Sequence, residues 1–339
     1  MKIDAGIGWD LDSVGAQAEE FEAYGFSGIF SPETAHDPFL PLLVAAQHTS
    51  QIELMTSVAI AFGRSPMNLA QIGHDLNAAS RGRFILGLGS QVRAHITRRY
   101  SMPWSRPAAR MREYVQAMQA IWACWYERKP LEFKGEFYTH TLMNPLFTPT
   151  NITYKAPKVF LAAVGPLMTE VTGEVADGLI THAFTTEKYL RETTLPALNR
   201  GFAKSGRQRT EFEISCLLFI VTGRDEDEFE KSKMAARRQI AFYGSTPTYK
   251  PVLDSIGMGA LQPELLQLSK QGKWEEMGNL IDDNTLSAFA VIGEPDRIAQ
   301  QILQRYGALV DRISLAWGEV LIESLTGFIT TLTEGSAAY

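Results

Sequence analysis

Cysteine is scarce in this chain of 339 residues, which contains only Cys124 and Cys216. The two lie far apart without CxxC spacing, which disfavours a disulfide framework and a thiolate metal site. The chain also lacks any run of about 18 apolar residues and an apolar signal-peptide core near its N-terminus. We therefore expect no membrane partner and a cytoplasmic location.

An excess of positive charge is also missing, because the formal net charge is -6. An acidic balance argues against general nucleic-acid binding. Histidine, cysteine and carboxylate side chains form no cluster at metal-ligand spacing, so we expect no metal. The remaining partner class is a small organic molecule.

Short apolar runs that alternate with amphipathic helical segments dominate the chain, of which 45% is hydrophobic. Eight such runs occur: KIDAGIGW, SGIFSPE, IELMTSVAI, RFILGLGS, KVFLAAVG, DGLITHAF, FEISCLLFIVTG and DRISLAWG. This alternation predicts a parallel sheet with right-handed crossovers. Eight units without a composition break favour an α/β fold of the (β/α)8 TIM-barrel type over an open doubly wound sheet.

We expect residues 1–339 to form a single barrel domain with two inserted segments. The first, at about 126–156, follows the fourth strand and reads as a hairpin or loop. The second, at about 244–287, lies between the seventh and eighth strands and reads as helical, with turns at Pro247, Gly257 and Gly272.

The stretch ILGLGSQVRAH, residues 85–95, resembles a dinucleotide-binding turn because Gly87 and Gly89 follow an apolar run. The Rossmann pattern is GxGxxG, however, and position 92 is valine. The stretch also belongs to the fourth β-unit, whereas that pattern opens the first. We interpret it as a barrel strand whose glycines either make room inside the barrel or contact a cofactor.

Polar or conformationally special residues follow most of the expected strands. The carboxyl ends of barrel strands form the active face, so we expect these residues to share one site. They are Trp9 after the first strand, Glu33 and His36 after the second, Ser57 after the third, Ser90 after the fourth, Gly165 after the fifth, and His182 and Thr185 after the sixth. Hydroxyl and backbone donors of this kind suit an organic cofactor.

Several segments resemble the bacterial luciferase-like superfamily, and specifically its coenzyme F420-dependent oxidoreductases. The most specific are TSV after the third strand, GLGS after the fourth and GP…ADG around the fifth and sixth. The resemblance implies a luciferase-like TIM barrel and hydride transfer between the deazaflavin C5 and an organic substrate such as an alcohol, ketone or activated alkene. It also implies a homodimer.

The resemblance assigns cofactor roles to individual positions. It implies a non-proline cis peptide at Ser57–Val58 behind the cofactor ring, and ring or tail contacts from Ser90 and Gln91. It also implies a phosphate-binding turn formed by Gly165, Pro166, Leu167 and Met168, which Thr185 could assist. Helix N-termini suit such an anion because their N–H groups point outward.

The chemistry also requires a group that moves a proton. His36 is the first candidate, since an imidazole needs little tuning near neutral pH. Glu33 would orient it or act in its place, and His95 is the second histidine candidate. Trp9 could cover the substrate or the ring. For each of these residues a purely structural role stays open, as it does for His182.

An arginine-rich segment follows the fourth strand. It suits the phosphodiester and polyglutamate tail of F420, or it is a solvated helix face. Its members are Arg93, Arg98, Arg99, Arg106, Arg110 and Arg112. Aromatic and methionine side chains in the same region could line an apolar substrate pocket, or belong to the core or an interface. They are Tyr100, Met102, Trp104, Phe133, Phe137, Tyr138, Met143 and Phe147.

Two alternative functions stay open. An FMN-dependent monooxygenase of the luciferase type shares the scaffold, and a flavin- or deazaflavin-binding carrier without turnover would share the cofactor site. Some relatives that oxidise sugar phosphates carry Gly-Glu after the fourth strand and Asp-His after the second. This chain has Gln91-Val92 and Pro32-Glu33 there, so that activity is not expected.

Overall fold

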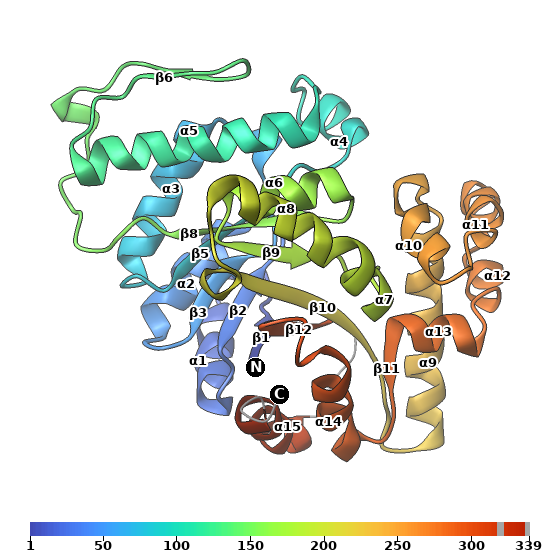
Figure 1. Ribbon diagram of the computed structural model, residues 1–339. Helices are drawn as coiled ribbons and strands as arrows, with labels where there is room; N and C mark the ends of the chain where they lie inside the picture. The colour runs from blue at the N-terminus through green and yellow to red at the C-terminus, as the bar shows by residue number, and fades with distance from the viewer. Residues whose placement is uncertain (317–321, 336–339) are drawn as a thin grey trace.

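Eight strands close into a parallel barrel in the computed structural model, which describes residues 1–316 and 322–335 (Figure 1). They are β1 (Lys2–Gly6), β2 (Gly28–Ser31), β3 (Glu53–Thr56), β5 (Phe84–Gly89), β8 (Lys158–Ala163), β9 (Gly178–Thr181), β10 (Glu213–Val221) and β12 (Arg312–Ala316). Pairing of β12 with β1 and of β9 with β10 completes the ring, which confirms the barrel over an open sheet.

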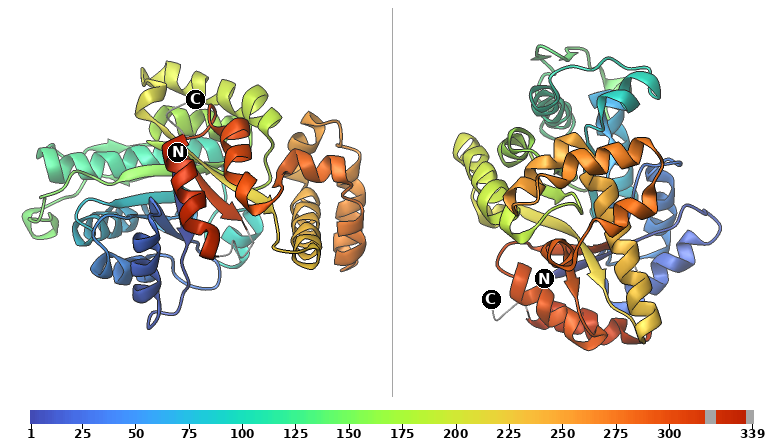
Figure 2. Two further views of the ribbon diagram at one scale, coloured as in Figure 1. Left: turned by 90° about the horizontal axis from the view of Figure 1, so that it is seen from below. Right: turned by 90° about the vertical axis from the view of Figure 1, so that its right-hand side faces the viewer.

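Helices cover the outside of the barrel (Figure 2). They are α1 (Val14–Tyr24), α2 (Phe39–His48), α3 (Pro66–Ala79), α5 (Pro107–Glu127), α6 (Pro166–Val175), α8 (Leu195–Ser205), α9 (Glu226–Gly244), α14 (Pro295–Tyr306) and α15 (Ile322–Gly335). Gly25 terminates α1 in a left-handed conformation with a φ of 87°, which suits glycine. The pattern did not predict α15.

Both expected insertions are present. The first contains the hairpin of β6 (Phe133–Lys134) and β7 (Thr139–His140), which runs beside α5 (Figure 1). The second contains α10 (Lys250–Ser255), α11 (Leu261–Lys270), α12 (Trp274–Asn279) and α13 (Asp283–Phe289), packed beside α9. Gly257 and Gly272 make its turns with φ values of 78° and 70°.

Two short strands were not predicted. One, β4 (Ala59–Ile60), follows a bulge after β3 and pairs with β5; the other, β11 (Ala290–Ile292), adds to the outer end of β10. The eighth apolar run, DRISLAWG, is a strand as far as Ala316, and Trp317 and Gly318 lie outside the described residues.

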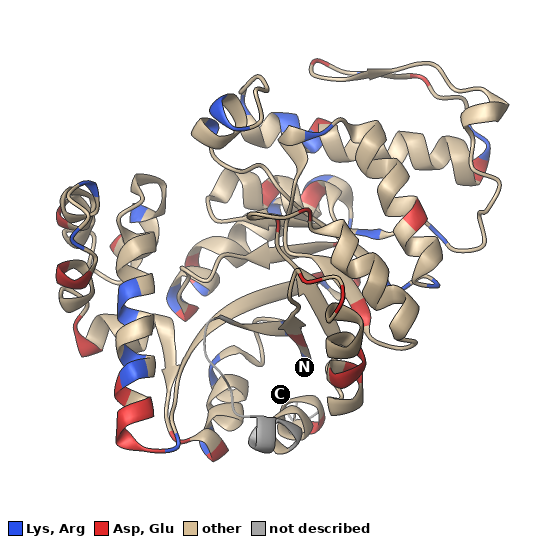
Figure 3. Cartoon of the chain, turned by 180° about the vertical axis from the view of Figure 1, so that it is seen from behind, with Lys and Arg blue, Asp and Glu red and all other residues tan. Residues whose placement is uncertain are grey.

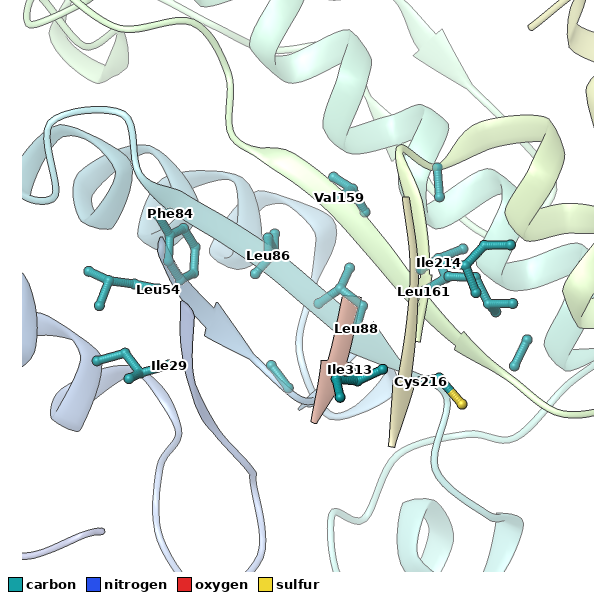
Figure 4. Close-up of a cluster of buried hydrophobic side chains, with 14 of the residues drawn as sticks. Ile29, Leu54, Phe84, Leu86, Leu88, Val159, Leu161, Ile214, Cys216 and Ile313 are labelled. Atoms are coloured by element: carbon teal, nitrogen blue, oxygen red, sulfur yellow. The ribbon is translucent and has the colours of Figure 1, made fainter. Parts of the chain in front are cut away.

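Side chains on the barrel strands alternate between the helices and the barrel interior. The outward set forms the main core with the helices, and Figure 4 shows examples from five strands: Ile29, Leu54, Leu86, Leu161 and Ile313. All five are completely buried. The inward-facing side chains differ from these because they include charged residues, and they determine which end of the barrel is filled.

Charged side chains fill the N-terminal end of the barrel interior. Arg312 and Asp4 form a bidentate ion pair with N–O distances of 2.7 and 2.8 Å. Only 0% and 1% of their surfaces are exposed. Arg312 also donates to Glu53 at 2.9 Å and Glu213 at 3.2 Å. Because β12 carries Arg312 and β1 carries Asp4, the pair joins the last and first strands of the ring.

Gly28 makes room for this pair. A Cβ atom there would lie 2.5 Å from Asp4 Oδ1 and 2.8 Å from Arg312 Nη2. Both distances are too short for real contacts. A side chain at this position of β2 would therefore displace the buried Asp4–Arg312 pair.

Glu213 gives the charged cluster a measurable pH dependence. Burial alone would raise the pKa of Glu213, but the hydrogen bond from Lys158 and the charges of Arg312 and Lys2 outweigh it and hold the pKa at about 2. Because the folded pKa is depressed, the stabilisation is present above the unfolded value and is lost as pH falls toward 2.

We therefore expect Glu213→Gln to lower the free energy of unfolding at pH 7 by on the order of 3 kcal/mol. Urea titrations between pH 7 and pH 3 should show the difference from wild type shrinking with acid. Glu228→Gln is the control. The pKa of Glu228 is also about 2, chiefly because of its hydrogen bond with Arg224, but its side chain is partly exposed on the surface of α9. Equal, pH-independent losses in both variants would contradict this account.

Candidate active site at the mouth of the barrel

The C-terminal half of the barrel interior is open, in contrast to its N-terminal half. Gly6 is exposed although it lies within β1 and pairs with Phe30 of β2. Phe30, Ala162 and Leu217 are only half-buried at similar heights on other strands. Small residues and incomplete burial mean that the side chains of residues 1–316 and 322–335 do not fill the mouth, whereas they fill the layers below.

The two glycines of ILGLG bring β5 close to the strand beside it. A Cβ atom at Gly87 would lie 1.8 Å from the carbonyl oxygen of Thr56, and one at Gly89 would lie 2.7 Å from Val58 Cγ2. The Thr56 hydroxyl also donates to the Gly87 carbonyl at 2.7 Å. These glycines therefore make room inside the barrel, the first of the two roles that the sequence left open.

The bulge between β3 and β4 is placed at this mouth. The Ser57–Val58 peptide bond is cis, as the sequence analysis expected at that position. The Ser57 N–H donates to the Ser31 carbonyl at 2.9 Å, and the Glu33 N–H donates to the Val58 carbonyl at 3.3 Å. The bulge is thus held against the end of β2.

Both carboxylate oxygens of Glu33 accept hydrogen bonds from other residues of the protein, and only 6% of its side chain is exposed. Oε2 accepts from the Ile60 N–H at 2.7 Å and from Arg64 Nη1 at 2.6 Å, and Oε1 accepts from the Tyr100 hydroxyl at 2.8 Å. Burial and the bond to Glu33 raise the pKa of Tyr100, so its hydroxyl stays protonated. This set indicates a bracing role for Glu33.

Arg64 holds both ends of the segment that carries His36. Besides Glu33, it donates to Asp37 Oδ2 at 3.1 Å. Burial would lower the pKa of Arg64, but the bond and charge of Glu33 and the charge of Asp37 raise it, so the guanidinium stays charged. His36 therefore projects from a short loop fixed at residues 33 and 37.

Trp9 and His36 come together across two loops. Their ring centroids lie 5.4 Å apart at an interplanar angle of 31°, and 41% of Trp9 is exposed. His36 is exposed too. The pair offers an aromatic face and a solvent-accessible imidazole beside the open mouth.

Ser90, Gln91 and His95 follow β5, as expected, but the side chains of Ser90 and Gln91 make local hydrogen bonds. The Ser90 hydroxyl donates to the Gln91 carbonyl at 3.1 Å, and Gln91 Oε1 accepts from the Val92 N–H at 2.9 Å. Gln91 has a φ of 56°, a left-handed conformation uncommon for glutamine. His95 is exposed on α4 (Arg93–Arg98).

The N-terminus of α6 is uncapped. Gly165 is the N-cap residue, no side chain caps the helix, and Pro166 has no N–H. The N–H groups of Leu167 and Met168 therefore point out of the first turn. Gly165 is exposed, and an added Cβ there would meet no atom within 4 Å. The space in front of this helix end is open.

Thr185 lies on the connection that follows β9. The Tyr189 hydroxyl of α7 (Glu187–Tyr189) donates to the Val164 carbonyl at 3.1 Å, which ties the two connections together. Thr185 itself is buried. Thr186 caps α7 by accepting from the Tyr189 N–H at 3.1 Å.

His182 at the end of β9 lies among aromatic rings. Its centroid is 4.5 Å from that of Tyr243 and 4.7 Å from that of Tyr249. Nδ1 accepts from the Phe184 N–H at 3.0 Å. Burial lowers the pKa of His182 to about 4, so the imidazole is neutral near pH 7.

The arginine-rich segment is dispersed in the structure, although Figure 3 shows basic residues near α4 and the start of α5. Arg110 is buried and donates to the Tyr138 hydroxyl and the Pro103 carbonyl. The other engaged members are Arg99 with the Thr34 carbonyl, Arg106 with Glu136, and Arg112 with Glu174. Arg93 and Arg98 are exposed.

Most of the aromatic and methionine side chains singled out in the region after the fourth strand belong to the core. One group packs against the main core: Tyr100, Met102, Trp104, Tyr138 and Met143. Phe147 is 62% exposed. Core packing, one of the alternatives left open, thus accounts for most of them.

Within residues 1–316 and 322–335, no three His, Cys, Asp or Glu side chains are grouped so that they could hold a metal ion. No helix in those ranges has the length and apolar character needed to cross a membrane. The predicted homodimer and cytoplasmic location stay predictions.

Sequence reasoning missed Arg64, Tyr243 and Tyr249. Two carboxylates, Glu33 and Asp37, lie close together in sequence and need a cation, but nothing in the sequence indicates which arginine supplies it. The two tyrosines come from α9 and the turn that follows it, and no periodic signal directs them to the barrel mouth.

The chain belongs to the luciferase-like monooxygenase family, whose pattern matches residues 4–312. It is 52% identical to an uncharacterized protein of Mycobacterium tuberculosis over 92% of both chains. It is also 25% identical to a putative coenzyme F420-dependent oxidoreductase of that organism, over 89% of this chain and 92% of the relative.

Solved structures share the fold. The coenzyme F420-dependent tetrahydromethanopterin reductase of Methanopyrus kandleri has a TM-score of 0.77 at 18% identity, covering 98% of this chain and 97% of that one. The FMN complex of the oxygenating component of 3,6-diketocamphane monooxygenase from Pseudomonas putida has a TM-score of 0.63 at 16% identity, with 94% and 89% covered. The family thus includes oxidoreductases that use either cofactor.

The brace around Glu33 gives a stability prediction. Arg64→Ala should lower the free energy of unfolding by about 2–3 kcal/mol, because it leaves a nearly buried carboxylate without its cation. Arg98→Ala, at an exposed arginine of α4, should change it by less than about 0.5 kcal/mol. Urea unfolding measures both, and equal values in the two variants would contradict the bracing role.

Proposed function

We propose that this protein is a coenzyme F420-dependent oxidoreductase that transfers a hydride between the deazaflavin C5 and an organic substrate. The open mouth above Gly6, bordered by the bulge at Ser57–Val58 and the uncapped N-terminus of α6, carries this proposal. A flat ring with a phosphate-bearing tail matches both features.

The residues present fit such a cofactor. The N–H groups of Leu167 and Met168 and the dipole of α6 would hold its phosphate, and Gly165 leaves space for close approach. Thr185 would add a hydroxyl. Val58 would lie against the ring, with Ser90 and Gln91 beyond it on the β5 side.

F420 is proposed over FMN because relatives in sequence support it. A relative with 25% identity over most of its length is named as a putative F420-dependent enzyme, whereas the FMN-bound neighbour shares only the fold. Exposed Arg93 and Arg98 on α4 would suit a long anionic tail.

The bound deazaflavin would supply or accept the hydride, and the protein would supply alignment and proton transfer. An imidazole nitrogen of His36 would deliver the proton to the substrate oxygen or remove it, depending on direction. Trp9 would cover the substrate from the side of His36. Glu33 would act through position, because all its hydrogen bonds are internal.

Titration of the purified protein with F420 and with FMN tests the cofactor. We expect fluorescence quenching by tight binding of F420 and weak binding of FMN. Tight binding of FMN without binding of F420 would favour the luciferase-type monooxygenase. Tight F420 binding without bleaching by any alcohol or reductant would favour the carrier.

Gly165→Asp sharpens this titration. An aspartate N-cap should stabilise α6 by about 1 kcal/mol, while its charge repels a phosphate at the same N–H groups. The melting temperature should therefore rise as the F420 affinity falls by at least about tenfold. Gly165→Ala is the control, because its backbone angles of −79° and 153° suit alanine and its Cβ meets open space. An unchanged affinity in Gly165→Asp would remove α6 from the phosphate site.

His36→Ala should lower turnover by on the order of 100-fold while leaving the F420 dissociation constant almost unchanged, since the residue moves a proton rather than binding the cofactor. His95→Ala, the matched variant on α4, should retain most activity. Steady-state kinetics and fluorescence titration measure the two quantities. The opposite ranking of the two variants would transfer the proton role to His95.

A further inference from the structure

His182 projects into the barrel mouth from β9. It follows Gly178 and Ile180 at two-residue spacing, and both of these face the interior, since Gly178 lies against Phe160 and Ile180 packs in the inner cluster. In the ring of strands, β9 lies opposite β2. His182 therefore faces the site from the side opposite to His36.

The hydrogen bond at Nδ1 fixes the tautomer of His182. Because Nδ1 accepts from the Phe184 N–H, a neutral ring carries its proton on Nε2. Protonating Nδ1 would break that bond, and burial opposes the charged ring as well, which agrees with a pKa of about 4. Above about pH 5, Nε2–H is a permanent neutral donor.

Among the residues that the structure describes, the side chains packed around this donor carry no charge. Within that part of the chain, the titratable groups whose rings lie on the imidazole are Tyr243 of α9 and Tyr249 at the end of the turn Pro247–Tyr249. Burial raises the pKa of Tyr249, so its ring stays neutral. Val164, just after β8, and Leu217 of β10 are half-buried and belong to the same apolar cluster.

We propose that His182, Tyr243 and Tyr249 form a substrate subsite for the uncharged oxygen of an apolar carbonyl compound or alcohol. Nε2–H donates a hydrogen bond to that oxygen, and the two tyrosine rings bind the adjoining hydrocarbon. The proposal deepens the function proposed above by naming its substrate class, and it rests on that function only for the hydride step.

The subsite divides the work between two histidines. A neutral imidazole keeps its Nε2 proton, so His182 orients and polarises the substrate oxygen, as a neutral imidazole does in other enzymes. His36, exposed on the opposite side, moves the proton. Because the rings beside His182 supply no cation, an anionic substrate loses its hydration there without compensation.

Binding of cyclohexanone to the full-length protein without cofactor tests the subsite. Methylenecyclohexane is the matched probe, since it has the same shape without the acceptor oxygen. Two-dimensional NMR of the Ala183 and Phe184 amides follows both titrations. We expect the ketone to bind about tenfold more tightly than the alkene, because only the ketone accepts a hydrogen bond from Nε2–H.

Two variants separate the ring nitrogens. His182→Asn retains an acceptor near Nδ1 for the Phe184 N–H but lacks the donor at Nε2, so ketone and alkene should bind equally. His182→Gln places an amide N–H near the Nε2 position and should recover part of the preference. A variant-independent preference, or tighter binding of cyclohexanecarboxylate than of cyclohexanone, would overturn the subsite.

Parallel titration with F420 distinguishes failure of this proposal from failure of the proposed function. If F420 binds to wild type but cyclohexanone does not shift the Ala183 and Phe184 signals, the subsite is wrong and the cofactor assignment stands. If F420 does not bind but the ketone preference is present and depends on His182, the subsite stands and the cofactor assignment is wrong.

Discussion

The buried ion pair between Arg312 and Asp4 is the constraint on which the barrel depends. It joins the last strand to the first at a point where neither side chain reaches water. Such a pair costs much desolvation and is not in itself a source of stability, but removing one partner leaves the other charge unpaired. Closure of the ring and satisfaction of these charges are therefore one requirement.

The filled lower half of the interior makes the open upper half possible. With charges and large rings packed below, the strands keep their spacing although Gly6 has no side chain and Ala162 has only a methyl group. The glycines of β5 then allow the bulge at Ser57–Val58 to approach within contact distance. The mouth is thus shaped by missing side chains, and its rim by the loops that Arg64 and Glu33 hold.

Electrostatics assigns different tasks to the polar residues around this mouth. Glu33 faces a hydroxyl, an amide and a guanidinium, so its charge is used internally. His36 is exposed beside Trp9, so its imidazole is accessible from the solvent. His182 is held neutral by burial and by one backbone N–H. Three side chains at strand ends, alike as titratable residues in the sequence, therefore differ in their environments.

The sequence by itself determined the eight β/α units, their order, the two insertions and the strand ends at which polar residues meet, because these follow from local periodicity and chain order. It also placed the cis peptide at Ser57–Val58 through family resemblance. Only the tertiary structure decided which side chains pair with one another through ion pairs, hydrogen bonds and ring contacts. Arg64 reaches Glu33 and Asp37, and Arg110 is buried against Tyr138. Tyr243 of α9 and Tyr249 of the second insertion lie beside His182. Burial and partner identity depend on contacts between residues far apart in the chain, and no local pattern encodes them.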